Sequence, residues 1–218
     1  MTAVTMPNGR PQPARDEAEL ASLVAARLCH DLVSPLGAIG NGVELIEMGG
    51  QPTPAQSPEM QLIADSVASA RAHIRVFRVA FGATAPDQRM SVADLAALVR
   101  DMGQDSRLHL QLDATGDLPR TEARMILLAV MCLDTALPWG GRVLICRGAQ
   151  GWRLVAEADR TRPAPDLWAW LTPQCQGVGP LEEPQPSAVQ FALLNAHAAA
   201  ARRPLAGEMD ENGAEISF

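Results

Sequence analysis

The sequence predicts an α+β protein in which an N-terminal antiparallel helical hairpin precedes an α/β sandwich. Residues 16–48 and 57–81 repeat apolar side chains at alternating intervals of three and four, which is typical of helices that pack along a seam. From residue 90 onward, short apolar runs alternate with helical patterns and are separated by glycine and proline, which indicates strands between helices. We therefore expect a disordered tail at 1–17, a hairpin domain at 18–83 and a second domain at 90–218.

The first predicted helix covers 16–48, with Asp16 as its N-cap and a stop at Gly49. Its seam consists of Ala25, Leu28, Leu32, Pro35, Ile39, Gly42 and Ile46. His30 lies two positions before a seam residue, so we expect its side chain to point into solvent from a rigid element. Pro35 has no N–H for the carbonyl of Asp31, which predicts a kink there; the alternative is a helix that tolerates the proline.

The second predicted helix covers 57–81, with Ser57 as N-cap and Pro58 at the first helical position. Its seam consists of Met60, Ile63, Val67, Ala70, Ile74, Phe77 and Phe81. A loop at 51–56 joins the two helices. Further apolar residues flank the seams, at Leu23, Leu36, Val43, Leu62, Val76 and Val79. This width predicts a four-helix bundle formed by two chains, the alternative being that the second domain covers the surface.

The second domain follows a linker at 82–89. We expect helices at 92–102, 121–137, 166–171 and 187–201, a Pro/Gly-rich loop at 172–186, and strands at 108–112, 142–146 and 152–157. Leu118 and Pro119 are expected to end the first strand and to separate it from the following helix. Residues 204–208 and 214–218 are predicted to form a final β-hairpin.

Composition excludes several classes of protein. The net charge of −7 disfavours nucleic-acid binding, which needs a basic face. No apolar run approaches the ~20 residues of a membrane helix, and the first 15 residues lack the apolar core of a signal peptide, so we expect a cytoplasmic protein that does not bind membranes. The four cysteines form no C-x-x-C pair, and no histidine pair has metal-ligand spacing, so no metal site is predicted.

The residues around His30 carry a resemblance to a known family. His30-Asp31-Leu32, followed by Pro35-Leu36, resembles the H-box of dimerising histidine kinases. The longer run at 28–42, with its glycines and asparagine, resembles the ChpT-type bacterial histidine phosphotransferases. The order of helices and strands after residue 90 resembles a degenerate form of the kinase ATP-binding domain. The resemblance implies a phosphotransfer hairpin followed by such a domain.

Chemistry at His30 fits this resemblance. A neutral imidazole is a good nucleophile near pH 7 and forms a covalent bond with a phosphoryl group. The resemblance assigns Asp31 to orient the ring or take its Nδ1 proton, the alternative being a solvated acid beside an exposed histidine. Arg27 and Ser34 lie one turn away and are candidate phosphoryl contacts.

Small residues follow His30 along the helix and lower its surface, which favours close approach of another protein. The alternative is loose helix packing, but glycines here reduce helix propensity. The candidate docking residues for a receiver domain are Gly37, Ala38, Asn41 and Glu44 on the first helix, with Ser66, Ser69 and Ala70 on the second.

We therefore interpret the chain as a phosphorelay histidine phosphotransferase. It would accept a phosphoryl group on His30 from a receiver aspartate of a hybrid histidine kinase and pass it to a response regulator. The Mg²⁺ for the reaction would come with the receiver, and the chain would act as a homodimer. Two alternatives are an ATP-dependent histidine kinase core and a non-catalytic dimeric interaction module.

The second domain is expected neither to bind ATP nor to phosphorylate the chain. Kinase relatives hold Mg²⁺ with an asparagine in the helix before a Gly-Gly turn, and counting back from that turn gives Cys132, a poor ligand for Mg²⁺. Asp134 is a candidate substitute. The segment after Glu157 lacks the glycines of the kinase nucleotide turn, and Glu182 and Glu183 would repel a triphosphate.

Overall fold

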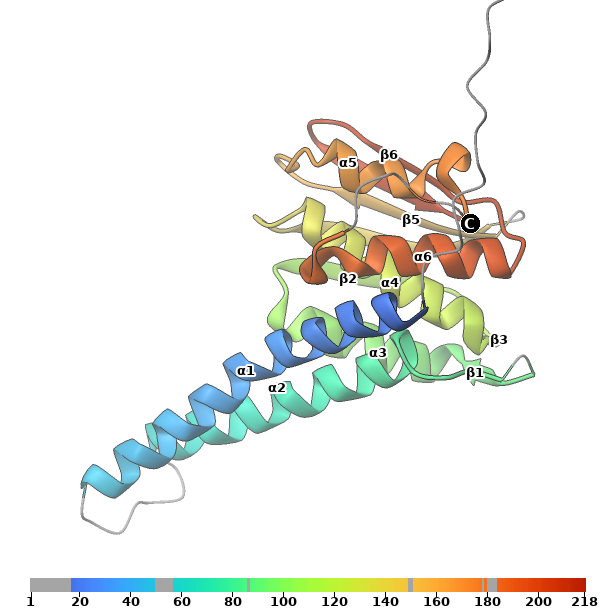
Figure 1. Cartoon of the computed structure of the whole chain (residues 1–218). Coiled ribbons are helices and arrows are strands. Elements are labelled where there is room, and N and C mark those ends of the chain that lie inside the picture. The colour runs from blue at the N-terminus through green and yellow to red at the C-terminus, as the bar shows by residue number, and fades with distance from the viewer. Residues whose placement is uncertain (1–16, 50–56, 86, 149–150, 178, 180–183) are drawn as a thin grey trace, which may run out of the picture.

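The computed structural model describes residues 17–49, 57–85, 87–148, 151–177, 179 and 184–218 (Figure 1). The predicted tail, the N-cap at Asp16, the loop at 51–56 and the acidic pair Glu182 and Glu183 lie outside the described residues. The model is a mixed α+β fold, with a long helical hairpin followed by helices packed on a sheet. This architecture confirms the α+β fold class predicted for the chain.

Two long helices, α1 (Glu17–Gly49) and α2 (Pro58–Ala80), lie side by side and project from the rest of the molecule (Figure 1). Ser57 caps α2 as predicted, because its hydroxyl accepts a hydrogen bond of 3.2 Å from the backbone N–H of Met60. The α1 helix continues through Pro35. The proline is therefore contained within one helix, and the kink at Pro35 stays a prediction.

The α1–α2 seam is tight where α1 carries small residues. Pro35 and Gly42 are buried, and a Cβ atom built on Gly42 would lie only 2.7 Å from Cγ1 of Ile63. The predicted seam of α2 is wrong at Ile74, which is 47% exposed, whereas Val76 is buried. Helical periodicity locates an apolar face, but it does not reveal which neighbouring element covers that face.

A short two-stranded sheet was not predicted. Strand β1 (Arg89–Ser91) pairs antiparallel with β3 (Asp117–Pro119), at the residues interpreted as a linker and a break. Strands of three residues are too short to show alternation, so their pairing depends on contacts remote in the sequence. Between them, α3 (Val92–Asp105) begins at the N-cap Ser91 and extends three residues beyond its predicted end.

The main sheet has the strand order β2-β4-β5-β7-β6. Its strands are β2 (Leu108–Asp113), β4 (Gly141–Gly148), β5 (Gly151–Glu157), β6 (Ala206–Met209) and β7 (Gly213–Ser217). Strands β2 and β4 are parallel, and the remaining neighbours are antiparallel. Buried and more exposed residues alternate along β4, β5 and β7, so helices cover one face of the sheet. These strands confirm the predicted β-segments, including the final hairpin.

Helix α4 (Arg120–Ala136) is the centre of the core. Residues 122–133 of α4 are all buried, because this helix lies between the sheet, α6 (Val189–Ala200) and the C-terminal half of α2. A short helix, α5 (Pro165–Trp168), continues into a 3-10 turn at Ala169–Leu171, and further turns lie at Pro173–Cys175 and Pro186–Ala188. Val76, Phe77 and Val79 of α2 belong to the same hydrophobic core as the sheet. The second domain thus covers part of the hairpin, the arrangement given above as the alternative.

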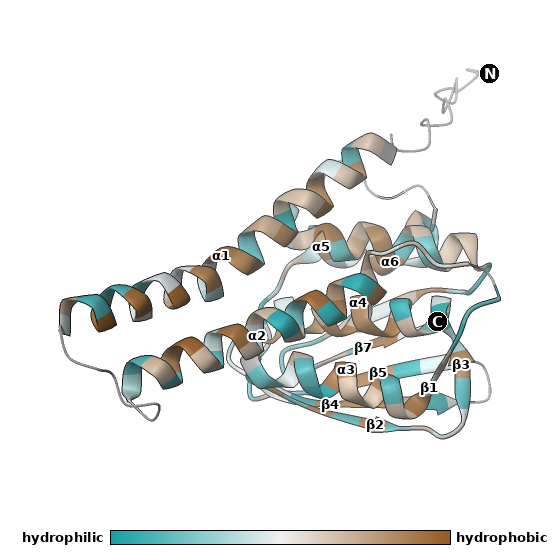
Figure 2. Ribbon diagram, turned by 90° about the horizontal axis from the view of Figure 1, so that it is seen from below, coloured by the Kyte–Doolittle hydropathy of each residue, from teal (hydrophilic) through white to brown (hydrophobic). Residues whose placement is uncertain are grey.

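The projecting part of the hairpin keeps apolar residues at its surface (Figure 2). The exposed apolar residues of α1 and α2 are Val33, Leu36, Val43, Leu45, Met48, Met60, Leu62 and Ile74. One helical span, Ala18–Gly49, is long and apolar enough to cross a membrane by length and composition, with a mean hydropathy of 1.2 over 18 residues. That span was not anticipated from the sequence, but it is weak support for a membrane helix, because α1 carries an ion pair and packs on α2 and α6.

Candidate functional site

His30 stands on the outer surface of α1, with its side chain 81% exposed. The helix is anchored on either side of it, because Leu28 packs against the core and Pro35 is buried. The histidine therefore reaches solvent from a fixed backbone, as the heptad pattern predicts. This placement gives a large partner direct access to the imidazole.

The neighbouring Asp31 is mostly buried, with 17% of its side chain exposed. Its Oδ1 atom lies 3.0 Å from Nδ1 of His30. A carboxylate in this position accepts a hydrogen bond from Nδ1–H and thereby favours the tautomer in which Nε2 is unprotonated. In that tautomer the available ring lone pair is on Nε2 of His30.

Arg27 holds the other oxygen of Asp31. Its Nε donates to Oδ2 of Asp31 at 2.5 Å, and the two residues are one helical turn apart. Its Nη1 donates to the carbonyl of Ser187 and to Oε1 of Gln190, the latter at 3.3 Å. The structure thus engages Arg27 with Asp31 and α6, whereas Ser34 is exposed on α1.

A groove of about 820 Å³ lies between α1 and the second domain and is lined by His30. Asp31 and Arg27 form its α1 wall, and Arg162 and Asp166 line the opposite side. The side chains of Arg162 and Asp166 are both exposed and charged, so the groove offers polar contacts to a protein that approaches His30. Arg162 was not among the residues predicted from the sequence to contribute to the site.

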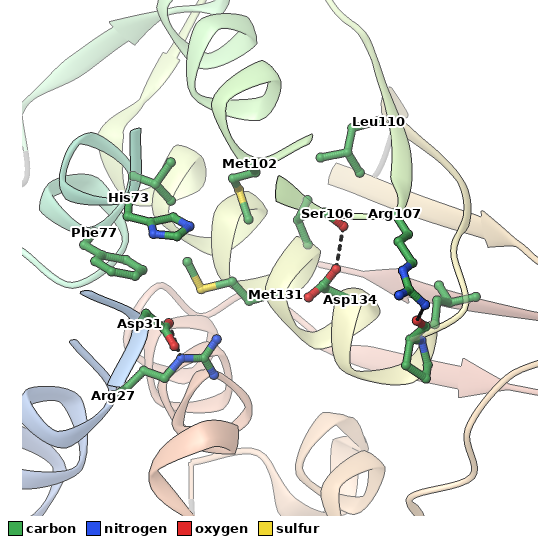
Figure 3. A pocket seen from close by; sticks show the side chains of 14 residues that line it. Arg27, Asp31, His73, Phe77, Met102, Ser106, Arg107, Leu110, Met131 and Asp134 are labelled. Atoms are coloured by element: carbon green, nitrogen blue, oxygen red, sulfur yellow. Dashed lines mark hydrogen bonds and ion pairs between the residues drawn. The ribbon is translucent and has the colours of Figure 1, made fainter. Parts of the chain in front are cut away.

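A smaller cavity of about 390 Å³ lies behind Asp31, where the hairpin meets α3 and α4 (Figure 3). His73 stacks on Phe77 at its α2 wall. At its other end, Asp134 accepts a hydrogen bond of 2.6 Å from the Ser106 hydroxyl. The cavity therefore lies next to Asp31, which contacts His30, and to Asp134, the candidate substitute for the Mg²⁺ ligand.

The structure separates the candidate docking residues into two groups. On α1, Gly37, Asn41 and Glu44 are exposed and Ala38 is half-buried, and no atom outside the local helix lies within 4 Å of a Cβ built on Gly37. On α2, Ser66 is buried and donates to the carbonyl of Leu62, so it is not part of a docking surface. Ser69 and Ala70 are half-buried, because they lie towards the seam.

The positions compared with the kinase nucleotide site differ in exposure. Cys132 is fully buried, and burial raises the pKa of its thiol well above the ordinary value. Asp159 is exposed after β5, and the Arg160 guanidinium stacks 3.7 Å above the Trp139 ring. Among the residues that the model describes, no group of three or more acidic, histidine or cysteine side chains is placed to hold a metal ion.

Two contributors to the site were missed from the sequence, Gln190 and Thr135. Gln190 is 1% exposed, and its Nε2 donates to the Thr135 hydroxyl at 3.0 Å. A glutamine near the start of the apolar helix at 189–200 was the available signal, because a buried amide requires partners. Its partner Arg27 lies 163 positions away, too far for pattern analysis to connect them.

An exposed histidine beside a mostly buried aspartate on a helical hairpin, joined to an α/β sandwich, is the combination that places the chain in a class of proteins. The model of the histidine phosphotransferase C-terminal domain family matches residues 92–213, which is more than half of the chain. The chain belongs to this family.

Comparisons with individual proteins give one curated relative and two solved structures. The protein phosphotransferase ChpT of Brucella abortus (strain 2308) is 30% identical over 129 residues, which span 58% of this chain and 60% of that protein. A solved bacterial phosphotransferase superposes with a TM-score of 0.77 at 23% identity, over 95% of this chain and 98% of that one, and so has the same fold. The Acinetobacter baumannii histidine kinase AdeS aligns with a TM-score of 0.45 at 12% identity, over 87% of this chain and 96% of that one.

Proposed function

We propose that this chain is a phosphorelay histidine phosphotransferase that carries the phosphoryl group on Nε2 of His30. The observation that carries the proposal is the exposed imidazole whose Nδ1 lies 3.0 Å from the Asp31 carboxylate. Membership of the histidine phosphotransferase family supports it. The donor is an aspartyl phosphate on the receiver domain of a hybrid histidine kinase, and the acceptor is an aspartate of a response regulator.

In the transfer step, the lone pair of His30 Nε2 attacks the phosphorus of the aspartyl phosphate. A P–N bond forms, the P–O bond to the aspartate breaks, and the aspartate leaves as a carboxylate. The ring keeps its Nδ1 proton and gains positive charge, which the adjacent Asp31 carboxylate offsets. Reversal of these bonds on a second receiver completes the relay. The receiver would supply the Mg²⁺, and this chain contributes position and charge.

Ser34 and Arg27 differ in what they offer to the phosphoryl group. The exposed hydroxyl of Ser34 is free to donate to a phosphoryl oxygen, one helical turn after His30. Arg27 acts through Asp31 instead, because its guanidinium is already engaged by Asp31, Ser187 and Gln190. The receiver would dock on the exposed surface of α1 at Gly37, Ala38, Asn41 and Glu44, with Ser69 and Ala70 at its border.

The homodimer and the cytoplasmic location belong to the same proposal. Apolar residues along both projecting helices support pairing of two hairpins into a four-helix bundle, since water-exposed apolar patches of this kind mark interaction surfaces. We place the phosphotransferase among cytoplasmic two-component signalling proteins that bind neither nucleic acid nor membrane. A monomeric mass in sedimentation at micromolar concentration would contradict the dimer.

We also propose that the second domain does not support ATP-dependent autophosphorylation. Cys132 supports this, because a buried, protonated thiol is a poor ligand for Mg²⁺. Titration calorimetry with Mg-ATP should show no micromolar binding. Self-labelling of His30 by ATP would instead favour the kinase core, and a folded dimer without any phosphoryl transfer would favour the non-catalytic interaction module.

A phosphotransfer assay tests the main proposal. Purified receiver domains carrying labelled aspartyl phosphate are mixed with the full chain, and the label on the chain is followed with time. His30→Gln should abolish labelling, whereas His109→Gln, at an exposed histidine on β2, should leave it intact. Equal labelling of the His30→Gln chain would disprove the assignment.

A further inference from the structure

Gln190 of α6 is a buried amide whose two ends are both hydrogen-bonded. Its Oε1 accepts from Arg27 Nη1 at 3.3 Å, and its Nε2 donates to Thr135 Oγ1 at 3.0 Å. A guanidinium can only donate, so the amide oxygen must face Arg27 and the amide nitrogen must face Thr135. The Thr135 hydroxyl in turn donates to the carbonyl of Met131 within α4. The orientation of the Gln190 side chain is therefore determined.

These bonds continue without a gap to the phosphoacceptor. Arg27 connects Gln190 to Oδ2 of Asp31, and Oδ1 of Asp31 faces Nδ1 of His30. The path leads from the interior to the surface: Gln190 is 1% exposed, the Arg27 and Asp31 side chains are 20% and 17% exposed, and the His30 side chain is 81% exposed. The path runs from α4 through α6 to α1, and so from the core of the second domain to the outer face of the hairpin.

Arg27 needs this support because a long side chain is otherwise free to choose among rotamers. The carbonyl of Ser187 and the amide oxygen of Gln190 hold one end of its planar guanidinium. That leaves Nε directed at Asp31, which is consequently held against rotation about its own side-chain bonds. Asp31 can then keep its second oxygen beside His30.

We propose that Gln190 is a positioning residue for phosphoryl transfer. It fixes Arg27, and through Arg27 and Asp31 it holds the His30 imidazole in the tautomer that leaves Nε2 free. The second domain thereby acts as a brace for the hairpin, a role that requires no nucleotide. This inference rests on the proposed function for its kinetic part, whereas its structural part concerns the imidazole alone.

The test compares variants of the full-length protein at the buried amide. Gln190→Met keeps the length and apolar stem but removes both hydrogen bonds, and Gln190→Glu restores an acceptor for Arg27. Gln111→Met, at an exposed glutamine on β2, is the matched control. Transfer from a phosphorylated receiver should be about 10-fold slower in Gln190→Met, less than the ~100-fold that misplacement of a reacting group produces.

Two further readouts separate positioning from packing. Because Gln190 is buried, the receiver concentration at half-maximal rate should not change, so the loss should fall on the maximal rate. Nitrogen-15 NMR of the His30 ring should show mainly Nδ1–H in the wild type and a mixture of tautomers in Gln190→Met. Gln190→Glu should recover both the rate and the wild-type tautomer.

Unchanged rate and tautomer in Gln190→Met would overturn the proposal while leaving the proposed function intact. Slow transfer that Gln190→Glu fails to rescue, with an unchanged imidazole spectrum, would overturn it as well, because it assigns Gln190 to packing alone. Should Gln190→Met not fold, Arg27→Lys on the surface of α1 replaces it and should give the same mixed tautomers. Absence of labelling in the wild type would refute the proposed function instead, and the NMR comparison would still decide the role of Gln190.

Discussion

His197 should make the protein sensitive to acid. This histidine on α6 is mostly buried, and burial, together with the nearby Arg124, lowers its pKa to about 4. Nη1 of Arg124 lies 3.5 Å from Nε2 of His197, so the neutral ring accepts from the guanidinium. Protonation of His197 would place a second cation beside Arg124, whose guanidinium also donates to the carbonyl of Val79 at 3.4 Å.

The direction of the change in stability with pH follows from the protonation of His197 in the folded and unfolded states. In the unfolded chain the ordinary histidine pKa of ~6.5 applies, so between about pH 6.5 and pH 4 the unfolded state binds a proton that the folded state excludes. The free energy of unfolding therefore rises with pH across this window and falls on acidification. A difference of ~2.5 pKa units at ~1.4 kcal/mol each gives about 3 kcal/mol, a large share of a typical domain stability of ~5–15 kcal/mol.

Urea denaturation of the wild type and of His197→Gln measures the contribution of His197 to the free energy of unfolding. Other carboxylates also titrate in acid, so the quantity of interest is the difference between the two proteins at each pH. Relative to wild type, His197→Gln should gain about 2.5 kcal/mol on going from about pH 7.5 to about pH 4.5. The control His109→Gln should give no such gain. If wild type and His197→Gln lose stability in parallel, the attribution to burial and Arg124 is refuted.

Three further outcomes are expected. Asp31→Asn should slow phosphotransfer roughly 100-fold without unfolding the protein, since the transfer step loses a charged partner of His30; an unchanged rate in stopped-flow labelling would remove Asp31 from the chemistry. Gly42→Ala should destabilise the protein by about 1–3 kcal/mol in urea, because its Cβ would meet Ile63 at 2.7 Å, whereas Gly40→Ala, with open space around it, should stabilise by up to ~1 kcal/mol; equal effects would contradict the tight seam. Leu36→Glu should convert a dimer to monomers in analytical ultracentrifugation, and a dimer that survives this change would place the interface elsewhere.

Local patterns were sufficient for most of the fold. The heptad repeat located α1 and α2, and alternation located β2, β4, β5 and the final hairpin, because these elements bury one face with a regular period. The same patterns failed at β1 and β3, which have no period to detect, and at Ile74, where the seam of α2 gives way to a contact with α3 and α4. In each failure the decisive neighbour is distant in the sequence.

The candidate site likewise contains features that one helix determines and features that depend on distant parts of the chain. The exposure of His30 and its contact with Asp31 both arise within a single helix; the apolar pattern predicted the exposure, and the family resemblance implied the contact. The bonds from Arg27 to Ser187, in the turn before α6, and to Gln190 of α6 were not predicted, because only the folded chain brings these residues to α1. Ser66 was assigned to the docking surface from its position along α2, but it is buried, because burial depends on how the helix is rotated about its axis.

The apolar residues that α2 contributes to the common core have a consequence for how the molecule unfolds. Val76 and Phe77 contact a cluster that also contains α4 and the sheet, so neither region completes its interior alone. The hairpin and the sandwich are therefore one cooperative unit, despite their distinct outlines. A fragment that ends at residue 83 would contain all of α2 but would expose this apolar surface to water. The last turns of α2 would then unfold. The intact chain should melt in a single calorimetric transition, so a destabilising change in the sheet also weakens the helix pair that carries His30.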